Sequence, residues 1–256
     1  MAANQGDKAA PPTPLDGLKI LCFHGFGTSG EFMRFQMQSW LEKFPRTKFI
    51  HINGFTPFPS LFTMDPDIIK FHGDEKPVWD NFASGYQVSD LFPKDYSFDF
   101  DFPERQEINR IIEIIKEHDG IDGFFGFSQG AILTEIMVYY LESGKLDSKL
   151  EKRQKPYFVI LACPHPGISN MIQFRIPVFM MFGSVDNITK TCFMQLMRFR
   201  DATSTYFEGG HKVPVLTSRI ARLVTEFVQK AEKNRDKYRN HQWTEMTMQR
   251  AIMEKL

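Results

Sequence analysis

The chain has 256 residues, of which 42 % are hydrophobic, and its 31 basic residues balance its 31 acidic ones. This length fits one α/β domain with tails, and the balanced charge gives no global electrostatic reason to bind nucleic acid or an anionic membrane. Three widely spaced cysteines argue against a disulfide framework and a structural zinc site. Residues 1–14 have no apolar core, so we expect no secretory signal there, and no run of about 18 apolar residues could span a membrane. We therefore expect a reducing compartment, the cytoplasm.

Short apolar runs alternate with helical patterns from residue 18 onward. The runs predicted as strands are 18–23, 48–52, 121–125, 157–162, 177–182 and 204–207. The patterns predicted as helices are 31–44, 104–117, 129–141, 188–199 and 214–231. Near-continuous apolar strands that alternate with helices indicate an α/β fold with a central, mostly parallel sheet of about six strands. In such sheets, chemistry lies beyond the carboxyl ends of the strands.

Three segments do not follow this alternation: the two ends of the chain and one internal insertion. The predicted domain is therefore 16–232, with the insertion inside it. Residues 1–15 are small, polar and Pro-rich, so we expect a disordered tail. Residues 54–102 form a long insertion that carries nine of the 26 phenylalanines. A loop of this length is functional or disordered, and its aromatic content argues against disorder. Residues 233–256 suggest a helical extension that either binds a partner or packs on its own domain.

The strongest motif is Gly126-Phe127-Ser128-Gln129-Gly130, which follows a predicted strand and opens a predicted helix. This is the context that a nucleophile elbow requires. The turn is so tight that the residues two before and two after the serine must be small. The motif predicts Ser128 as a nucleophile whose backbone N–H lies at the start of a helix; the alternative is a glycine-rich turn with an idle serine.

A serine hydroxyl is a weak nucleophile and needs a base, which an acid in turn orients. His211 follows the last predicted strand, and Asp186 follows strand 177–182; both places fit the chain order serine, acid, histidine. Asp186 is the only carboxylate between residues 171 and 200. The alternatives are a loop histidine that caps a helix and an aspartate that only forms a turn.

An oxyanion needs two preorganised N–H donors. We expect them to be the backbone N–H groups of Gln129 and of Phe26, which lies in His24-Gly25-Phe26-Gly27 after the first strand. The glycines at 25 and 27 would let the backbone approach the substrate, and His24 precedes them in the same loop.

Other candidate groups are weaker. Cys163 and His165 lie two residues apart on a Pro-rich loop, which suits loop structure better than proton transfer, although His165 is a candidate pocket residue. His72 lies beside acidic residues and is expected to be solvated surface. We expect no metal site and no organic cofactor.

Four stretches carry a family resemblance: 21–30 around His24-Gly25-Phe26-Gly27, 123–131 around Ser128, 182–186 ending at Asp186, and 208–214 around His211. In order and context they resemble the FSH serine-hydrolase family over about residues 18–227. The resemblance implies a minimal α/β-hydrolase core, a Ser128–His211–Asp186 triad, and carboxylesterase or thioesterase activity toward acyl chains.

The sequence thus predicts a serine hydrolase that cleaves small-molecule carboxylic esters through an acyl-enzyme intermediate. The alternatives are a thioesterase or peptidase on the same triad, and a non-catalytic binding scaffold. The insertion 54–102 is predicted as a lid or acyl-pocket wall, or as packing on the core. Expected substrate contacts are His24, Gly25, Gly27, Phe55, Phe58 and His165. The oligomeric state stays open.

Overall fold

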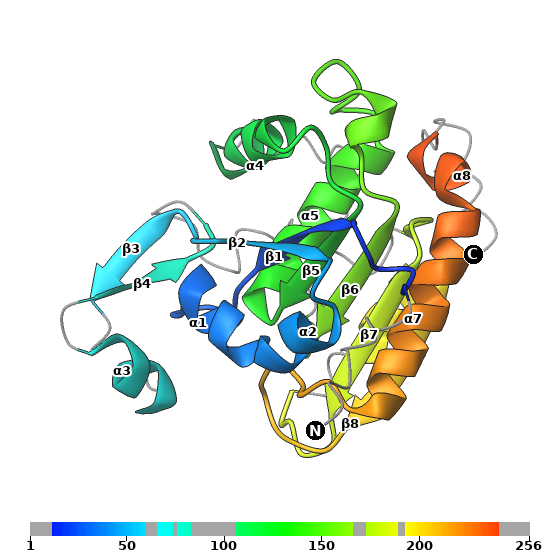
Figure 1. Ribbon diagram of the computed structural model, residues 1–256. Helices are drawn as coiled ribbons and strands as arrows, with labels where there is room; N and C mark the ends of the chain where they lie inside the picture. The colour runs from blue at the N-terminus through cyan, green and yellow to red at the C-terminus, as the bar shows by residue number, and fades with distance from the viewer. Residues whose placement is uncertain are drawn as a thin grey trace, which may run out of the picture.

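A central sheet of six parallel strands forms the framework of the protein (Figure 1). The computed structural model describes residues 12–59, 66–73, 76–82, 106–165, 173–188 and 193–240. The sheet has the order β2-β1-β5-β6-β7-β8, and its strands are β1 Lys19–Phe23, β2 Lys48–Ile52, β5 Gly123–Phe127, β6 Phe158–Ala162, β7 Val178–Gly183 and β8 Ala202–Phe207. All neighbouring strands in it pair in parallel, which confirms the predicted fold class.

Helices cover both faces of this sheet (Figure 1). The helices α4 and α5 pack on one face, and α1, α2 and α7 pack on the other. The bounds are α1 Gly30–Gln36, α2 Gln38–Lys43, α4 Gln106–Glu117, α5 Gln129–Glu142, α7 Ser218–Lys233 and the short α8 Arg235–Arg239. The described residues also include the 3₁₀ helices η3 Lys152–Gln154 and η4 Phe193–Arg198. This arrangement leaves the central strands without a solvent face.

The central strand β5 shows why the sheet is buried on both faces. All five of its residues are buried, and alternate side chains enter different cores: Phe124 packs with α4 and α5, and Phe125 packs with α1, α2 and α7. Trp40 of α2 meets the Phe125 ring edge-on at 5.2 Å, and its indole N–H donates to the Pro214 carbonyl at 2.9 Å. Period-two side chains that are apolar on both faces are typical of a covered parallel sheet.

Part of the insertion 54–102 is folded, which differs from the irregular loop expected there. Strands β3 Thr56–Pro59 and β4 Pro77–Asp80 form a small antiparallel sheet, and helix α3 Pro66–His72 lies between them in sequence. The prolines in both strands hid the pairing, because proline is tolerated only at sheet edges. The remaining insertion residues, 60–65, 74–75 and 83–102, lie outside the described residues.

Two predicted helices were wrong in form. The helix expected over 31–44 is broken at Met37, where α1 ends and α2 begins, and neither proline nor glycine marks that break in the sequence. Within the pattern at 188–199, the described helix is the 3₁₀ helix η4, and residues 189–192 lie outside the described residues.

The expected domain boundaries also need correction at the N-terminus. Leu15 was assigned to a disordered tail, but its side chain is fully buried in the core that contains α2 and α7. Residues 1–11 lie outside the described residues, as do residues 241–256 of the predicted C-terminal extension. In that extension the structure describes the end of α7 and the helix α8.

A buried ion pair joins η4 to α5. Arg198 Nη1 donates to Glu135 Oε2 at 2.9 Å, and the two side chains are 3 % and 0 % exposed. Removing one partner of a buried pair leaves a charge in a low-dielectric interior, whereas replacing both partners with apolar groups is often tolerated.

We therefore predict that Arg198→Met lowers the free energy of unfolding by about 3–5 kcal/mol, measured by urea denaturation. The double variant Arg198→Met with Glu135→Leu should recover most of this loss. A single variant as stable as the unmodified protein, or a double variant less stable than the single one, would contradict this reading.

Candidate active site

The turn between β5 and α5 has the geometry that the sequence motif predicted. Ser128 has φ 52° and ψ −115°, a left-handed conformation that is unfavourable for a residue with a Cβ and costs on the order of 1–3 kcal/mol. A Cβ on Gly126 would lie 2.5 Å from Thr134 Oγ1, and a Cβ on Gly130 would lie 2.1 Å from the Phe23 carbonyl oxygen. Both positions therefore require glycine, and the turn holds the serine at the start of α5.

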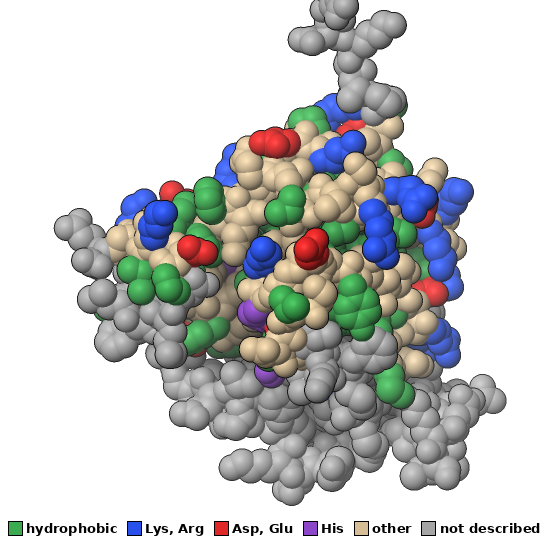
Figure 2. All heavy atoms as spheres, turned by 90° about the horizontal axis from the view of Figure 1, so that it is seen from below, with side chains coloured by type: hydrophobic (Ala, Val, Ile, Leu, Met, Phe, Trp, Pro, Cys, Tyr) green, Lys and Arg blue, Asp and Glu red, His purple; other side chains and the backbone are tan. Residues whose placement is uncertain are grey.

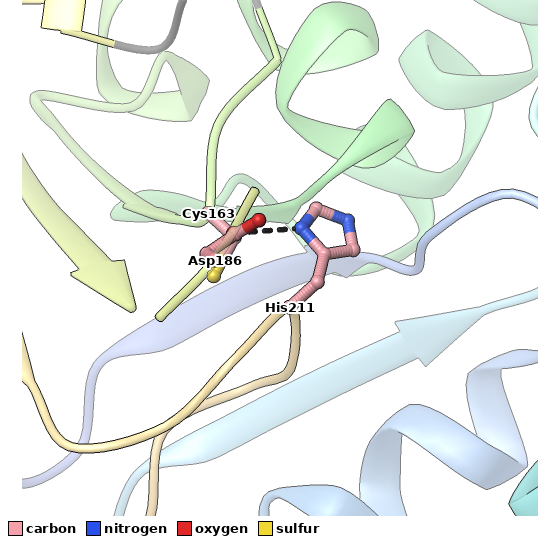
Figure 3. Close-up of side chains that lie close together, drawn as sticks. All are labelled: Cys163, Asp186 and His211. Carbon is pink, nitrogen blue, oxygen red and sulfur yellow. Dashed lines mark hydrogen bonds and ion pairs between the residues drawn. The ribbon is translucent and has the colours of Figure 1, made fainter. Parts of the chain in front are cut away.

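Three side chains from distant parts of the chain form one hydrogen-bonded line. His211 Nε2 lies 2.8 Å from Ser128 Oγ. His211 Nδ1 lies 2.8 Å from Asp186 Oδ2 (Figure 3). Close backbone contact aligns their loops, because a Cβ on Gly183 would lie 2.5 Å from the Gly210 carbonyl oxygen. The residues predicted as nucleophile, base and acid thus meet at the carboxyl ends of β5, β7 and β8.

Asp186 is held in its ionised form. Burial raises the pKa of this carboxyl, but the hydrogen bond to His211 and the hydrogen bond that Oδ1 accepts from the Ile188 N–H at 3.0 Å outweigh it. The net pKa lies below the ordinary value. An ionised carboxylate at this place accepts the Nδ1 proton of His211, which leaves Nε2 free to accept a proton from the serine.

The predicted oxyanion donors lie on two sides of this serine. Gln129 is the first residue of α5, and Phe26 lies in the loop after β1; in the described parts of the chain, neither backbone N–H has a protein acceptor. Gly25 brings this loop against the turn, because a Cβ there would lie 2.9 Å from the Phe127 ring and 3.4 Å from Ser128 Cβ. Gly27 has φ 65°, which favours glycine.

Strand β4 anchors the Phe26 loop, and sequence reasoning missed this role. The Gly27 N–H donates to the Trp79 carbonyl at 3.1 Å, and the Trp79 N–H donates to the Thr28 carbonyl at 2.7 Å. Asn81 Nδ2 donates to the His24 carbonyl at 2.7 Å and to Gln129 Oε1 at 3.0 Å. No local motif marks Trp79 or Asn81, because their contacts are made with residues about 50 positions away.

His24 does not serve as the substrate contact expected of it. Its side chain is fully buried; Nδ1 lies 2.7 Å from the Gly25 carbonyl oxygen, and Nε2 accepts the Gly54 N–H at 2.9 Å. Both ring nitrogens are thus occupied by the backbone. The imidazole supports the loop that carries Phe26 and cannot reach the substrate.

Phe58 and Phe55, which come from the same hairpin, have different surroundings. The Phe58 ring stacks on Phe26 with 5.6 Å between centroids, and Phe26 is 57 % exposed. Phe55 packs on the main core cluster, with the Arg110 guanidinium 5.2 Å from its ring centroid. Phe58 is therefore the better candidate for a group at the mouth of the site.

Two other histidines named from the sequence, His72 and His165, have different surroundings. His72 was expected on the surface, but it is buried, and its Nε2 lies 3.2 Å from Ser29 Oγ, the N-cap of α1. His165 is partly buried at the end of the described segment after β6, and its role in a pocket stays a prediction.

Figure 2 shows one face of the molecule, on which hydrophobic side chains lie in small separate groups beside residues that are not described. Among the described residues, the exposed large hydrophobic side chains include Phe26 and Val185, each next to a site residue.

One group of described residues has the chemistry to hold a metal ion: Cys163, Asp186 and His211, whose ligand atoms all lie within 4.8 Å of one another. Two of these atoms, Asp186 Oδ2 and His211 Nδ1, already share a hydrogen bond. An ion here would replace that hydrogen bond, so the group fits an acid–base pair better than a metal centre.

The buried His24 predicts a pH dependence of stability. Burial lowers its pKa to about 4, whereas an unfolded histidine titrates near 6.5. Between these values the unfolded chain binds a proton that the folded chain does not, so the free energy of unfolding falls as the pH drops from about 6.5 to about 4. Urea denaturation should show up to about 1.4 kcal/mol per pH unit from this group.

The variant His24→Gln should be less stable at pH 7 and should show a smaller pH slope in this window. His51, whose pKa burial also lowers to about 4, keeps its share of the slope in that variant. Equal slopes in the two proteins would contradict the assignment to His24.

Comparisons with known proteins identify the family to which the chain belongs. The serine hydrolase (FSH1) family matches residues 15–222. Esterase C25G4.2 of Caenorhabditis elegans is 23 % identical over 207 residues, which cover 78 % of this chain and 88 % of that protein. None of the described helices is long and apolar enough to cross a membrane.

Two solved structures are similar to the whole fold. Arabidopsis thaliana SOBER1 gives a TM-score of 0.50 at 13 % identity, with 84 % of this chain and 99 % of that chain covered. Esterase PE8 gives a TM-score of 0.51 at 13 % identity, with 86 % and 96 % covered. At such low identity these structures establish the α/β-hydrolase fold alone, whereas the family match spans most of the chain. The chain therefore belongs to the FSH1 serine hydrolase family.

Proposed function

We propose that the protein hydrolyses carboxylic esters, with Ser128 as nucleophile, His211 as general base and acid, and Asp186 as the carboxylate that orients the imidazole. The observation that carries this proposal is the continuous line of 2.8 Å contacts from Ser128 Oγ through both nitrogens of His211 to Asp186 Oδ2. The strained conformation of Ser128 supports it further, because strain in this turn is a common feature of functional sites.

In the first half of the reaction, Ser128 Oγ attacks the ester carbonyl carbon while His211 Nε2 takes the hydroxyl proton. The carbonyl oxygen becomes an oxyanion, which the N–H groups of Phe26 and Gln129 stabilise. As the tetrahedral intermediate collapses, the bond to the leaving alcohol breaks and His211 gives that alcohol its proton. An acyl-enzyme on Ser128 is left behind.

In the second half, His211 removes a proton from water as the water oxygen attacks the acyl carbon. The same N–H donors hold the new oxyanion. Collapse releases the carboxylic acid and returns the proton from His211 to Ser128 Oγ, so the site is regenerated. The Asp186 carboxylate stabilises the imidazolium in both halves and keeps Nδ1 protonated.

We further propose that Phe26 and Phe58 form an apolar wall for the acyl group. Phe26 supplies both a candidate oxyanion N–H and an exposed ring, and Phe58 stacks on that ring. A hydrocarbon chain bound to a carbonyl at Ser128 would gain about 0.8 kcal/mol for each methylene it buries there. This favours esters of a hydrophobic acid over acetate esters.

We also propose a cytoplasmic setting on the basis of the cysteines. Cys22 and Cys163 are both free and buried, and Cys192 lies outside the described residues. Buried free thiols are typical of proteins from reducing compartments.

Asp186→Asn should lower kcat for p-nitrophenyl ester hydrolysis by about 10³–10⁴-fold, because an amide donor facing Nδ1 favours the wrong imidazole tautomer. The matched control is Asp201→Asn, since the Asp201 carboxylate contacts Tyr238 and Lys230 instead. The control should keep the activity of the unmodified protein. Full activity in Asp186→Asn would remove Asp186 from the mechanism.

Phe58→Ala should lower the ratio of kcat/KM for an octanoate ester over an acetate ester by about tenfold, because part of the apolar wall is lost. Phe55→Ala, from the same hairpin, should reduce stability and leave this ratio unchanged. The measurement is a chain-length series of p-nitrophenyl esters on both variants. A ratio unaltered in Phe58→Ala would exclude the wall, although not the triad.

A further inference from the structure

Cys163 occupies a constrained position directly after β6. Its φ is 44°, an uncommon value for a residue with a Cβ, and its N–H donates to the Met181 carbonyl of β7 at 2.9 Å. The preceding carbonyl, that of Ala162, accepts the N–H of Ser128 at 3.1 Å. The backbone at this position is therefore tied to the nucleophile turn on one side and to the strand that leads to Asp186 on the other.

The Cys163 side chain lies against the acid–base pair. The residue is 1 % exposed, and its Sγ lies 3.5 Å from the Lys212 carbonyl oxygen and 3.8 Å from the Gly210 carbonyl oxygen. These two carbonyls flank His211 in sequence. Sγ also lies within 4.8 Å of the ligand atoms of Asp186 and His211, and Figure 3 shows the thiol beside the Asp186 carboxylate.

The Cys163 thiol is suited to donate a hydrogen bond and is a poor nucleophile. Burial, together with the neighbouring Asp186 carboxylate, raises the pKa of Cys163 to about 12, so the sulfur keeps its proton at neutral pH. A protonated thiol is a poor nucleophile but a weak hydrogen-bond donor that also fills space. Three of the neighbouring groups are hydrogen-bond acceptors: the carbonyls of Gly210 and Lys212 and the Asp186 carboxylate.

On the basis of the function proposed for the triad, we propose that Cys163 is a positioning residue for Asp186 and His211. Its thiol contacts the carbonyls on both sides of His211 and lies against the Asp186 carboxylate. These contacts hold the imidazole in line between the acid and Ser128. It does not touch the substrate, and it forms no covalent bond in the reaction.

The test compares Cys163→Ala and Cys163→Ser with Cys22→Ala. Cys22 is the matched control, because it is a second free, buried cysteine, and its Sγ donates to the Ile20 carbonyl within the core at 3.6 Å. We expect Cys163→Ala to lower kcat by about tenfold and leave KM within about twofold, since a misaligned base slows the chemical step and not substrate binding.

The pH profile separates positioning from packing. A misaligned imidazolium is stabilised less by the Asp186 carboxylate, so the acid limb of the kcat/KM profile should move to lower pH by about half a unit in Cys163→Ala. Cys163→Ser restores a donor and should return both the acid limb and kcat close to their original values. Cys22→Ala should leave the profile unchanged.

Cys163→Gly provides a second deletion if Cys163→Ala folds poorly, because glycine accepts the positive φ. A readout that needs no turnover is the proton resonance of His211 Nδ1–H, which should broaden or disappear in both deletions and return in Cys163→Ser. The positioning role is overturned if both deletions keep the original kcat, acid limb and resonance, or if serine fails to restore what alanine removes. Failure of the unmodified protein to hydrolyse any ester would instead overturn the proposed function, whatever this resonance shows.

Discussion

The close approach of the turn at Ser128 to β1 is the constraint on which the rest of the site depends. Gly130 lies so near the Phe23 carbonyl that even a methyl group would overlap it, with a Cβ at 2.1 Å. This contact sets the start of α5 directly beside the end of β1. As a result, the first N–H of the helix and the loop after β1 come to the same place, although about 100 residues separate them in the sequence.

That closeness has an energetic cost, which the surrounding structure offsets. The left-handed conformation of Ser128 is unfavourable by about 1–3 kcal/mol, and it persists because β5 is buried on both faces and α5 is buried along almost its whole length. The Gln129 side chain connects the turn to the β3–β4 hairpin through hydrogen bonds. It accepts from Asn81 and donates to Asp80 at 2.8 Å, so the turn, the Phe26 loop and the β3–β4 hairpin form one hydrogen-bonded unit.

The sequence was most informative where function follows from position along a strand. Ser128, Asp186 and His211 each come after an apolar strand, and parallel strands bring their carboxyl ends to one edge, so a local pattern sufficed to predict that they meet. The requirement for glycine at positions 126 and 130 could also be predicted, because it depends on the geometry of a single tight turn.

Features that depend on pairing between distant segments could not be predicted. His24 reads as an exposed loop residue, and only the Gly54 N–H, 30 positions away, shows that its ring is part of the scaffold. Likewise, Trp79, Asn81 and Cys163 lie beside the site because of where β4 and β6 end in the folded structure. Their own sequence surroundings do not indicate these contacts. Acid residues near His72 suggested a surface, but the contact with Ser29 buries it.

Labelling with a fluorophosphonate probe is the most direct test of whether Ser128 is an activated nucleophile. The adduct would be mapped by mass spectrometry in the unmodified protein and in Ser128→Ala. We expect one phosphonyl adduct, on Ser128, that the variant lacks. A well-folded protein that takes up no probe, or equal labelling of the variant, would mean that Ser128 is not an activated nucleophile.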